Sequence, residues 1–362
     1  MSAHLVHVVG ARPNFVKAAP VLKALAAHRD VRQTLVHTGQ HYDDRMSAIF
    51  FRELDLPRPD VDLGVGSGSH GVQTGALLAA LEPVFVDLAP TAVIVYGDVN
   101  STIAAALVCA KLGIGLVHVE AGLRSFDRTM PEEVNRVVTD QLSDLLLTTS
   151  AEAYAHLATE GVDAAKVRFV GNTMIDTLLA NLDRFDVSSV RSLLGLEGAY
   201  AVTTVHRPAN VDDPGAVRTL VEALSGVAAR IPLVVPLHPR GRVRLEEAGL
   251  AVAPGVRIVD PLGYVDFLGL VRGASLVVTD SGGVQEETTV LDVPCLTVRP
   301  NTERPVTITH GTNQLVPLEQ LVDRAEEVLD GRRVAPRDRP PLWDGHAGRR
   351  AAAEIIEFSR NR

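Results

Sequence analysis

The chain has 362 residues, of which 46% are hydrophobic and 22% are charged, as expected for a globular protein of two domains rather than a disordered chain. The formal net charge of −9 argues against general affinity for nucleic acid or for an anionic membrane. Two cysteines, Cys109 and Cys295, lie far apart in apolar segments. They predict neither a disulfide framework nor a metal site.

The N-terminal sequence MSAHLVHVVG leads directly into a strand-like run, without a charged leader or a long apolar stretch. We find no run that approaches the length of a transmembrane helix. These features predict a cytoplasmic protein without a membrane partner.

Short apolar runs alternate with helix-like segments along the chain. The runs that predict strands are HLVHVV, QTLVHT, AVIVYG, GLVHVE, LLLTTS and VRFVG, followed by YAVTTV, PLVVPL, VRIVD, SLVVTD and PCLTV. This alternation predicts an α/β protein with two doubly wound parallel sheets, one of about six strands and one of about five. We expect one domain at residues 1–171, a second at 172–345, and a final helix at 346–362 that packs back on the first. Ligands of such sheets bind at the carboxyl ends of the strands.

The segment GARPNFVKAAP follows the first predicted strand. Pro13 suits the first turn of a helix, and Arg12 and Lys17 place two cations near a helix N-terminus that already favours anions. A solvated basic pair is the alternative interpretation. The segment lacks the GxGxxG spacing of a dinucleotide site, which argues against a nicotinamide or flavin enzyme.

Carboxylates occur at the ends of two further strands of the first half. Asp98 follows VYG, where capping of the next helix is the alternative to a catalytic role. Glu120 ends GLVHVE, and a buried carboxylate there costs several kcal/mol unless it is paired or functional. The sequence TMPE, from Thr129 to Glu132, also fits a capping box.

In the second half, polar residues again follow strands. TVHRPAN supplies His206 and PLHPR supplies His238, and two histidines near one ligand site are less often structural than one.

The sequence DSGGVQEE brings Ser281, Gly282 and Gly283 to a helix start, which predicts a diphosphate cradle or, alternatively, an N-cap with a glycine turn. Glu287 lies one turn further and is placed to reach a ribose diol, and Arg304 in NTERPVT is a candidate phosphate ligand.

In this order, the motifs GARPNFVKAAP, TGQH, YGDVNST, HVEAGLRS, MPEEVNR, GNTMID, TVHRPANVD, PLHPR, DSGGVQEE, TERP and GTNQLV resemble those of the non-hydrolysing UDP-N-acetylglucosamine 2-epimerases. The resemblance covers nearly the whole chain. It implies two Rossmann-like domains facing a cleft, similar to glycosyltransferase-B enzymes. It also implies a homodimer that needs no cofactor.

By the matching motifs, the resemblance assigns a catalytic group and a set of substrate contacts. The catalytic group is Asp98, Glu120, Glu132 and His206. The substrate contacts are Arg12, Lys17, His238, Phe267, Ser281, Gly282, Gly283, Glu287 and Arg304.

The chain also departs from the family pattern. Asn14, Ala209 and Val306 stand where many members carry Glu. Ser69 and His70 stand where regulated members carry an Arg-Gln pair that helps to bind an activating second substrate molecule. We therefore expect no separate activator site.

The reaction implied is the conversion of UDP-N-acetylglucosamine to UDP-N-acetylmannosamine by inversion at C2. Because C2 has no adjacent carbonyl, we expect elimination of UDP to 2-acetamidoglucal and re-addition, with carboxylates as the acid/base groups. A hydrolysing epimerase that releases N-acetylmannosamine and UDP, a retaining UDP-sugar glycosyltransferase and a non-catalytic UDP-sugar sensor are the alternatives.

Overall fold

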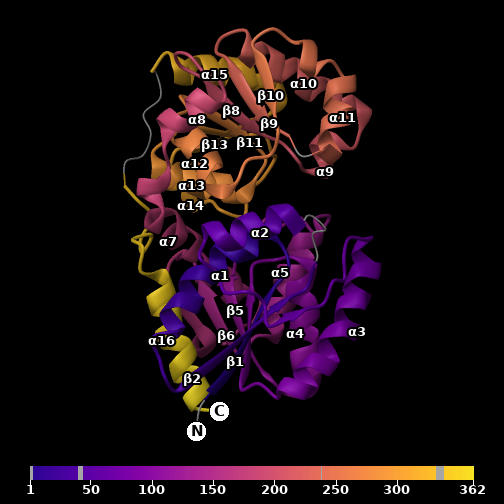
Figure 1. Ribbon diagram of the computed structural model, residues 1–362, viewed down its shortest axis with the longest axis vertical. Helices are drawn as coiled ribbons and strands as arrows, with labels where there is room; N and C mark the ends of the chain where they lie inside the picture. Colours follow the sequence, from indigo (N-terminus) through magenta and orange to yellow (C-terminus); the bar gives the residue numbers. More distant parts are fainter. Residues whose placement is uncertain (1–2, 40–43, 238, 332–337) are drawn as a thin grey trace. The chain divides into compact units, whose positions relative to one another are not determined.

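The computed structural model describes residues 3–39, 44–237, 239–331 and 338–362. The chain divides into two compact units, Met1–Ala180 with Pro341–Arg362, and Asn181–Pro340 (Figure 1). Each unit contains one sheet in which all strand pairs are parallel. The prediction of two doubly wound α/β units is therefore confirmed.

The sheet of the first unit has seven strands in the order β3-β2-β1-β4-β5-β6-β7. The strands are β1 (Ala3–Val9), β2 (Val31–His37), β3 (Val61–Asp62), β4 (Ala92–Tyr96), β5 (Gly115–Ala121), β6 (Leu145–Thr148) and β7 (Val167–Phe169). The helices are α1 (Arg12–Leu25), α2 (Asp44–Glu53), α3 (His70–Leu88), α4 (Asn100–Leu112), α5 (Pro131–Leu142), α6 (Ala153–Thr159), α7 (Thr173–Ala180) and α16 (Ala347–Arg360), with the 3₁₀ turn η1 (Ala164–Lys166).

Strand β4 is buried at every residue, as expected for a central parallel strand covered on both faces. On one face, three residues of α3 and three alanines of α4 form a continuous core with the sheet: Leu77, Leu81, Phe85, Ala104, Ala105 and Ala106. On the other face α1 and α16 lie side by side (Figure 1). They approach so closely that a Cβ on Gly348 would lie 2.8 Å from Pro20.

The sheet of the second unit has six strands in the order β10-β9-β8-β11-β12-β13. They are β8 (Ala201–Thr204), β9 (Leu233–Pro236), β10 (Val256–Val259), β11 (Leu276–Thr279), β12 (Cys295–Thr297) and β13 (Asn313–Leu315). The helices are α8 (Val187–Leu193), α9 (Pro208–Val211), α10 (Pro214–Ala228), α11 (Pro239–Glu247), α12 (Tyr264–Arg272), α13 (Gly282–Leu291), α14 (Val306–Thr309) and α15 (Leu321–Leu329), with 3₁₀ turns η2 (Leu182–Arg184), η3 (Leu250–Val252) and η4 (Leu318–Gln320).

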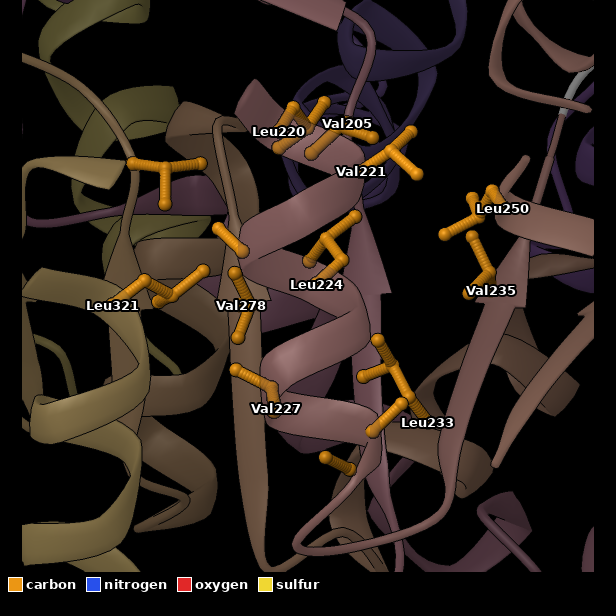
Figure 2. Close-up of a cluster of buried hydrophobic side chains, with 14 of the residues drawn as sticks. Val205, Leu220, Val221, Leu224, Val227, Leu233, Val235, Leu250, Val278 and Leu321 are labelled. Carbon is orange, nitrogen blue, oxygen red and sulfur yellow. The ribbon is translucent and has the colours of Figure 1, made fainter. Parts of the chain in front are cut away.

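Helix α10 shows why this unit folds as it does. Its apolar residues Leu220, Leu224 and Val227 recur at helical spacing, which gathers them on one stripe. Figure 2 shows this stripe between Leu321 and Val278 on one side and Leu233 on the other, within a single buried cluster. A branched-chain core of this kind fixes the sheet whose strand ends carry the polar residues described below.

The unit boundary differs from the prediction. The expected boundary at residue 171 assigned α7 to the second domain, but α7 belongs to the first unit. The reason is its polar contacts: Thr177 Oγ1 donates to the carbonyl of Val16, and the Asp176 carboxylate accepts the amides of Ala347 and Gly348. These bonds also join α16 to the first unit.

Helix α3 corrects another expectation. By length and composition alone, its 19 residues are enough to cross a membrane, whereas we expected no run of that length from the sequence. Its buried row of Gln73, Leu77, Leu81 and Phe85 faces the core of the first unit. Only 22% of its apolar window is buried, and a single helix of this kind is weak evidence for a membrane span.

In both sheets the strand order reverses once, between β1 and β4 and between β8 and β11. The carboxyl ends of strands at such a point form the usual ligand site of an open α/β sheet. The polar motifs after β1, β4, β8 and β11 occupy these two positions, and Glu120 ends the neighbouring β5.

Candidate active site

Lys17 and Glu120 form a buried ion pair at the carboxyl edge of the first sheet. Lys17 Nζ lies 2.7 Å from Glu120 Oε1, and the two side chains are 5% and 2% exposed. Lys17 projects from α1 and Glu120 from β5. Lys17 was expected among the cations at a helix N-terminus, but here it neutralises a candidate catalytic acid, which offsets the cost of burying that charge.

The backbone of Glu120 is strained. Its φ of 76° lies in the left-handed region, which side chains with a Cβ seldom adopt. The pairing of β5 with β6 shifts register between Val119 and Ala121, so Glu120 occupies a bulge. Bulges and strained residues are common beside active sites, where they turn a side chain out of the regular sheet.

Gly97 makes room for this ion pair. Its φ is 62°, and a Cβ at this position would lie 2.8 Å from Lys17 Nζ and 3.6 Å from Glu120 Oε1. A larger residue would therefore displace the lysine. The glycine of YGD is required both by its backbone angle and by the close approach of the pair.

Asp98 is held by an arginine of α5. Arg136 Nη1 lies 2.5 Å from Asp98 Oδ2, and the Asp98 side chain is 20% exposed. The amide of Asn135 also donates to the Asp98 carbonyl. Helix α4 has Val99 at its N-cap and no side-chain cap, so the helix-capping interpretation of Asp98 was wrong.

The capping box predicted for TMPE was also wrong. Helix α5 begins at Pro131 with Met130 at the N-cap, and no side chain caps it. Thr129 instead donates its hydroxyl to Asp127. Among the residues that the structure describes, Glu132 makes no hydrogen bond or ion pair and is half-buried.

The neighbouring Glu133 is the structural carboxylate. It accepts the amides of Ser125 and Phe126 and the hydroxyl of Ser125, and it pairs with Arg136 Nη2 at 2.6 Å. Burial raises the pKa of Glu133, but these hydrogen bonds and the Arg136 charge outweigh it and hold the pKa below its usual value. Glu133 and Arg136 therefore fix both Asp98 and the loop that follows Glu120.

Arg12 and Pro13 open α1 as predicted from the sequence. The Arg12 guanidinium lies 5.7 Å from the centre of the Phe50 ring, a cation–π distance. Asn14, which replaces a glutamate of the family pattern, accepts the amides of Gly10 and Ala11 and donates to the Tyr96 carbonyl. This asparagine ties the starts of two site loops together.

In the second unit, His206 is paired with Asp280. His206 Nδ1 lies 2.9 Å from Asp280 Oδ1, and the histidine is 64% exposed while the aspartate is fully buried. Asp280 also accepts the amides of His206 and Arg207 and the side chain of Asn210. Burial raises the pKa of Asp280, but the hydrogen bond and charge of His206 and these other donors lower it to about 2.

Asp280 therefore orients the His206 ring, so that Nε2 is the ring atom that can reach a ligand.

The SGG turn starts α13, with Ser281 at the N-cap. A Cβ on Gly282 would lie 2.4 Å from Arg304 Nη1, so the arginine packs directly on the turn. Arg304 pairs with Glu286 through Nε at 3.1 Å and with Glu303. The predicted phosphate ligand is thus already surrounded by carboxylates, an arrangement that the sequence did not indicate.

The other three predicted substrate contacts are Glu287, Phe267 and His238, and each has different surroundings. Glu287 is buried in α13, and burial followed by the charge of Glu286 raises its pKa to about 8. Phe267 is half-buried in α12. His238 lies outside the residues that the structure describes. Among those residues no group of three or more His, Cys, Asp or Glu could hold a metal ion.

Residues 23–356 match the family described as UDP-N-acetylglucosamine 2-epimerase. The chain belongs to this family. It is 40% identical over 355 residues to UDP-N-acetylglucosamine 2-epimerase of Methanocaldococcus jannaschii, covering 95% of this chain and 96% of the relative. A crystal structure of the M. jannaschii UDP-GlcNAc 2-epimerase in complex with UDP-GlcNAc and UDP superposes with a TM-score of 0.91 at 39% identity, covering 98% and 99% of the two chains.

Members of the family differ in substrate. The chain is 42% identical over 358 residues to UDP-2,3-diacetamido-2,3-dideoxy-D-glucuronate 2-epimerase of Pseudomonas aeruginosa, covering 97% of this chain and 98% of that relative. The two levels of identity are similar, so the family match establishes a UDP-sugar 2-epimerase and leaves the sugar to be tested.

Several site residues of this family member had no individual role predicted from the sequence. Glu133, Arg136 and Asp140 are buried in α5 at spacings of three and four residues, which places them on one helix face. A charged face on the helix that follows a strand-end acid in the chain is a usable signal. Asp280 gave a weaker signal in the sequence, because His206, the residue with which it pairs, is distant along the chain.

Proposed function

We propose that this protein interconverts UDP-N-acetylglucosamine and UDP-N-acetylmannosamine without hydrolysing them. The observation that carries the proposal is Glu120, a buried, strained carboxylate at the end of β5, paired with Lys17. A family member with 40% identity is named UDP-N-acetylglucosamine 2-epimerase, which supports the substrate and the C2 chemistry of the proposal.

The proposed reaction is an elimination followed by an addition. A carboxylate removes the C2 proton while the bond between C1 and the diphosphate oxygen breaks, which gives UDP and 2-acetamidoglucal. UDP then adds back to C1, and C2 receives a proton on the opposite face. Two faces require two proton-transfer groups, and we assign this work to Asp98, Glu120 and Glu132.

The surroundings of the three acids support different contributions. Lys17 and Arg136 place positive charge beside Glu120 and Asp98, which offsets the cost of burying these carboxylates. Among the described residues Glu132 has no such partner, so its carboxylate is not held in an ion pair.

In the second unit we assign the nucleotide contacts. The amides at the N-terminus of α13, next to Ser281, Gly282 and Gly283, are placed to stabilise the charge of the leaving diphosphate. Arg304 packs on this turn, and His206 is oriented by Asp280 to donate to a phosphate oxygen or to exchange a proton. Glu287 and Phe267 are proposed contacts of the nucleoside, and Arg12 of the substrate.

Product analysis tests this proposal. Purified protein is incubated with UDP-N-acetylglucosamine and followed by NMR, and UDP-2,3-diacetamido-2,3-dideoxy-D-glucuronate is offered in parallel. We expect UDP-N-acetylmannosamine from the first sugar. Release of free N-acetylmannosamine would instead identify a hydrolysing epimerase, and turnover of the second sugar alone would change the substrate assignment.

We also propose that the protein is a cytoplasmic homodimer. The outer face of helix α3 is a candidate association surface, because its apolar residues Val72 and Val86 are 70% and 62% exposed. Light scattering of the wild type and of Val86→Asp measures the mass. A monomeric wild type would remove the dimer from the proposal.

A further inference from the structure

Asp140 lies at the centre of a buried charge network that the proposed chemistry does not use. Its Oδ1 lies 2.6 Å from His118 Nδ1 and its Oδ2 lies 2.7 Å from Arg124 Nη2. Oδ2 also accepts the amide of Gly122 at 3.0 Å. All three side chains are 1% exposed or less. Arg124 continues to Glu160 through two hydrogen bonds.

His118 faces an acceptor on each side of its ring. Nδ1 meets the Asp140 carboxylate, and Nε2 lies 2.9 Å from the carbonyl oxygen of Gly97. A carbonyl oxygen only accepts, so the ring donates from Nε2. Burial raises the pKa of Asp140, but the charges and hydrogen bonds of His118 and Arg124 hold it below its usual value. Asp140 therefore accepts, and the ring donates from Nδ1 as well.

The two ends of this network lie on either side of Glu120. At one end is Gly97, whose amide donates to the Val119 carbonyl and whose missing Cβ leaves space for Lys17 Nζ. At the other end is Gly122, which has a φ of 79° and follows the bulge. Glu120 itself has a φ of 76°, and strain of this kind persists only where the surroundings impose it.

We propose that His118 and Asp140 are positioning residues that hold Glu120 in its strained conformation and thereby keep its carboxylate against Lys17. The inference rests on the proposed role of Glu120 in catalysis. His118 fixes the loop after β4, Asp140 fixes the loop after β5, and the bond between them sets the separation of the two loops. The pair does not touch the substrate.

The variants are His118→Gln, which cannot donate from two ring positions, and Asp140→Asn. Asp176→Asn is the matched control. Asp176 is another buried carboxylate of the first unit that accepts two amides, but its donors lie in α16. For each protein kcat, KM, UDP affinity and melting temperature are measured, and a crystal structure gives the φ of residue 120.

We expect His118→Gln and Asp140→Asn to lower kcat by about 10-fold to 100-fold with UDP affinity unchanged, and to release residue 120 from the left-handed region. Asp176→Asn should lower the melting temperature with kcat unchanged. A wild-type kcat in folded His118→Gln or Asp140→Asn, or a lowered kcat with Glu120 in place, would overturn the inference.

A measurement on the wild type covers the case in which neither variant folds. Nitrogen-15 NMR of the His118 ring should show both ring nitrogens engaged in hydrogen bonds, and a ring nitrogen without one would overturn the network. A wild type without epimerase activity would refute the proposed function instead, while the NMR result and the φ of residue 120 would still test the geometry.

Discussion

Substitutions of Glu132 and Glu133, which are adjacent in the first turn of α5, should have different effects on stability and activity. Glu133→Gln removes the charge that pairs with buried Arg136, so it should lower the free energy of unfolding by about 3 kcal/mol. Glu132→Gln removes no hydrogen bond or ion pair among the described residues and should leave stability unchanged, while it slows epimerisation by about 10²–10⁴-fold. Urea unfolding and initial rates on both variants check this. A stable, fully active Glu132→Gln would remove Glu132 from the mechanism.

The buried Glu287 predicts a pH dependence of stability. Burial raises its folded pKa to about 8, whereas an unfolded glutamate titrates near 4.3, a rough reference value. A raised pKa means that the stabilising contribution is complete below the unfolded pKa and is lost as the pH rises through about 8. The wild type should therefore lose stability between about pH 5 and about pH 9. Glu287→Gln should lose less stability over the same range.

Asp280 supplies the control with the opposite sign. Its folded pKa is lowered to about 2, so its contribution is present above the unfolded pKa and disappears as the pH falls through about 2. Asp280→Asn should therefore flatten the acid side of the unfolding curve. Equal slopes for wild type and Glu287→Gln on the alkaline side would show that Glu287 is not buried as described.

At the scale of elements, the N-terminus of α13 is the feature to test. A Cβ on Gly282 would lie 2.4 Å from Arg304 Nη1, so Gly282→Ala should displace the arginine and weaken UDP binding about 10-fold, the effect of losing one charged hydrogen bond. Calorimetry measures this. Gly75→Ala in α3 is the control, because a Cβ there meets nothing within 4 Å, and UDP affinity should not change. Unaltered affinity in Gly282→Ala would contradict the assignment of the turn.

The sequence predicted the helix and strand types better than their ends. The apolar runs predicted most strands. They missed β3, which has only two residues, and β13, which has the sequence NQL with two polar residues out of three. The start of α5 was misplaced because Thr129, a good capping residue, bonds Asp127 instead. Local competition of this kind between side-chain acceptors is not visible in spacing alone.

The candidate site was predictable where a residue ends a strand, as Asp98, Glu120 and His206 do. It was not predictable where function depends on a partner from another element. The pairing of Lys17 with Glu120 and of His118 with Asp140 joins residues 103 and 22 positions apart. Such contacts follow from the order of the strands and not from any short motif.

For the whole molecule we expect activity without an activator. His70, which replaces a residue of the regulated pattern, contacts Asn100 at 3.2 Å, and Asn135 donates both to Asn100 and to the Asp98 carbonyl. His70 is thus part of the polar chain behind a candidate catalytic acid. UDP-N-acetylmannosamine alone should therefore be converted without a lag.

The experiment follows the reverse reaction from UDP-N-acetylmannosamine with and without a trace of UDP-N-acetylglucosamine. The same assay on Ser69→Arg/His70→Gln tests whether the replaced pair is the cause. A lag in the wild type that the added sugar abolishes would show that an activator site operates after all.

The proposed elimination at C2 is tested most directly by epimerisation in D2O. If UDP leaves as the C2 proton is removed and then adds back, deuterium from the solvent must appear at C2 of both UDP-N-acetylglucosamine and UDP-N-acetylmannosamine. Free UDP and 2-acetamidoglucal should also accumulate slightly on long incubation. NMR and mass spectrometry of the purified nucleotide sugars read out both. Epimerised product without deuterium at C2 would contradict the mechanism and the role assigned to Glu120.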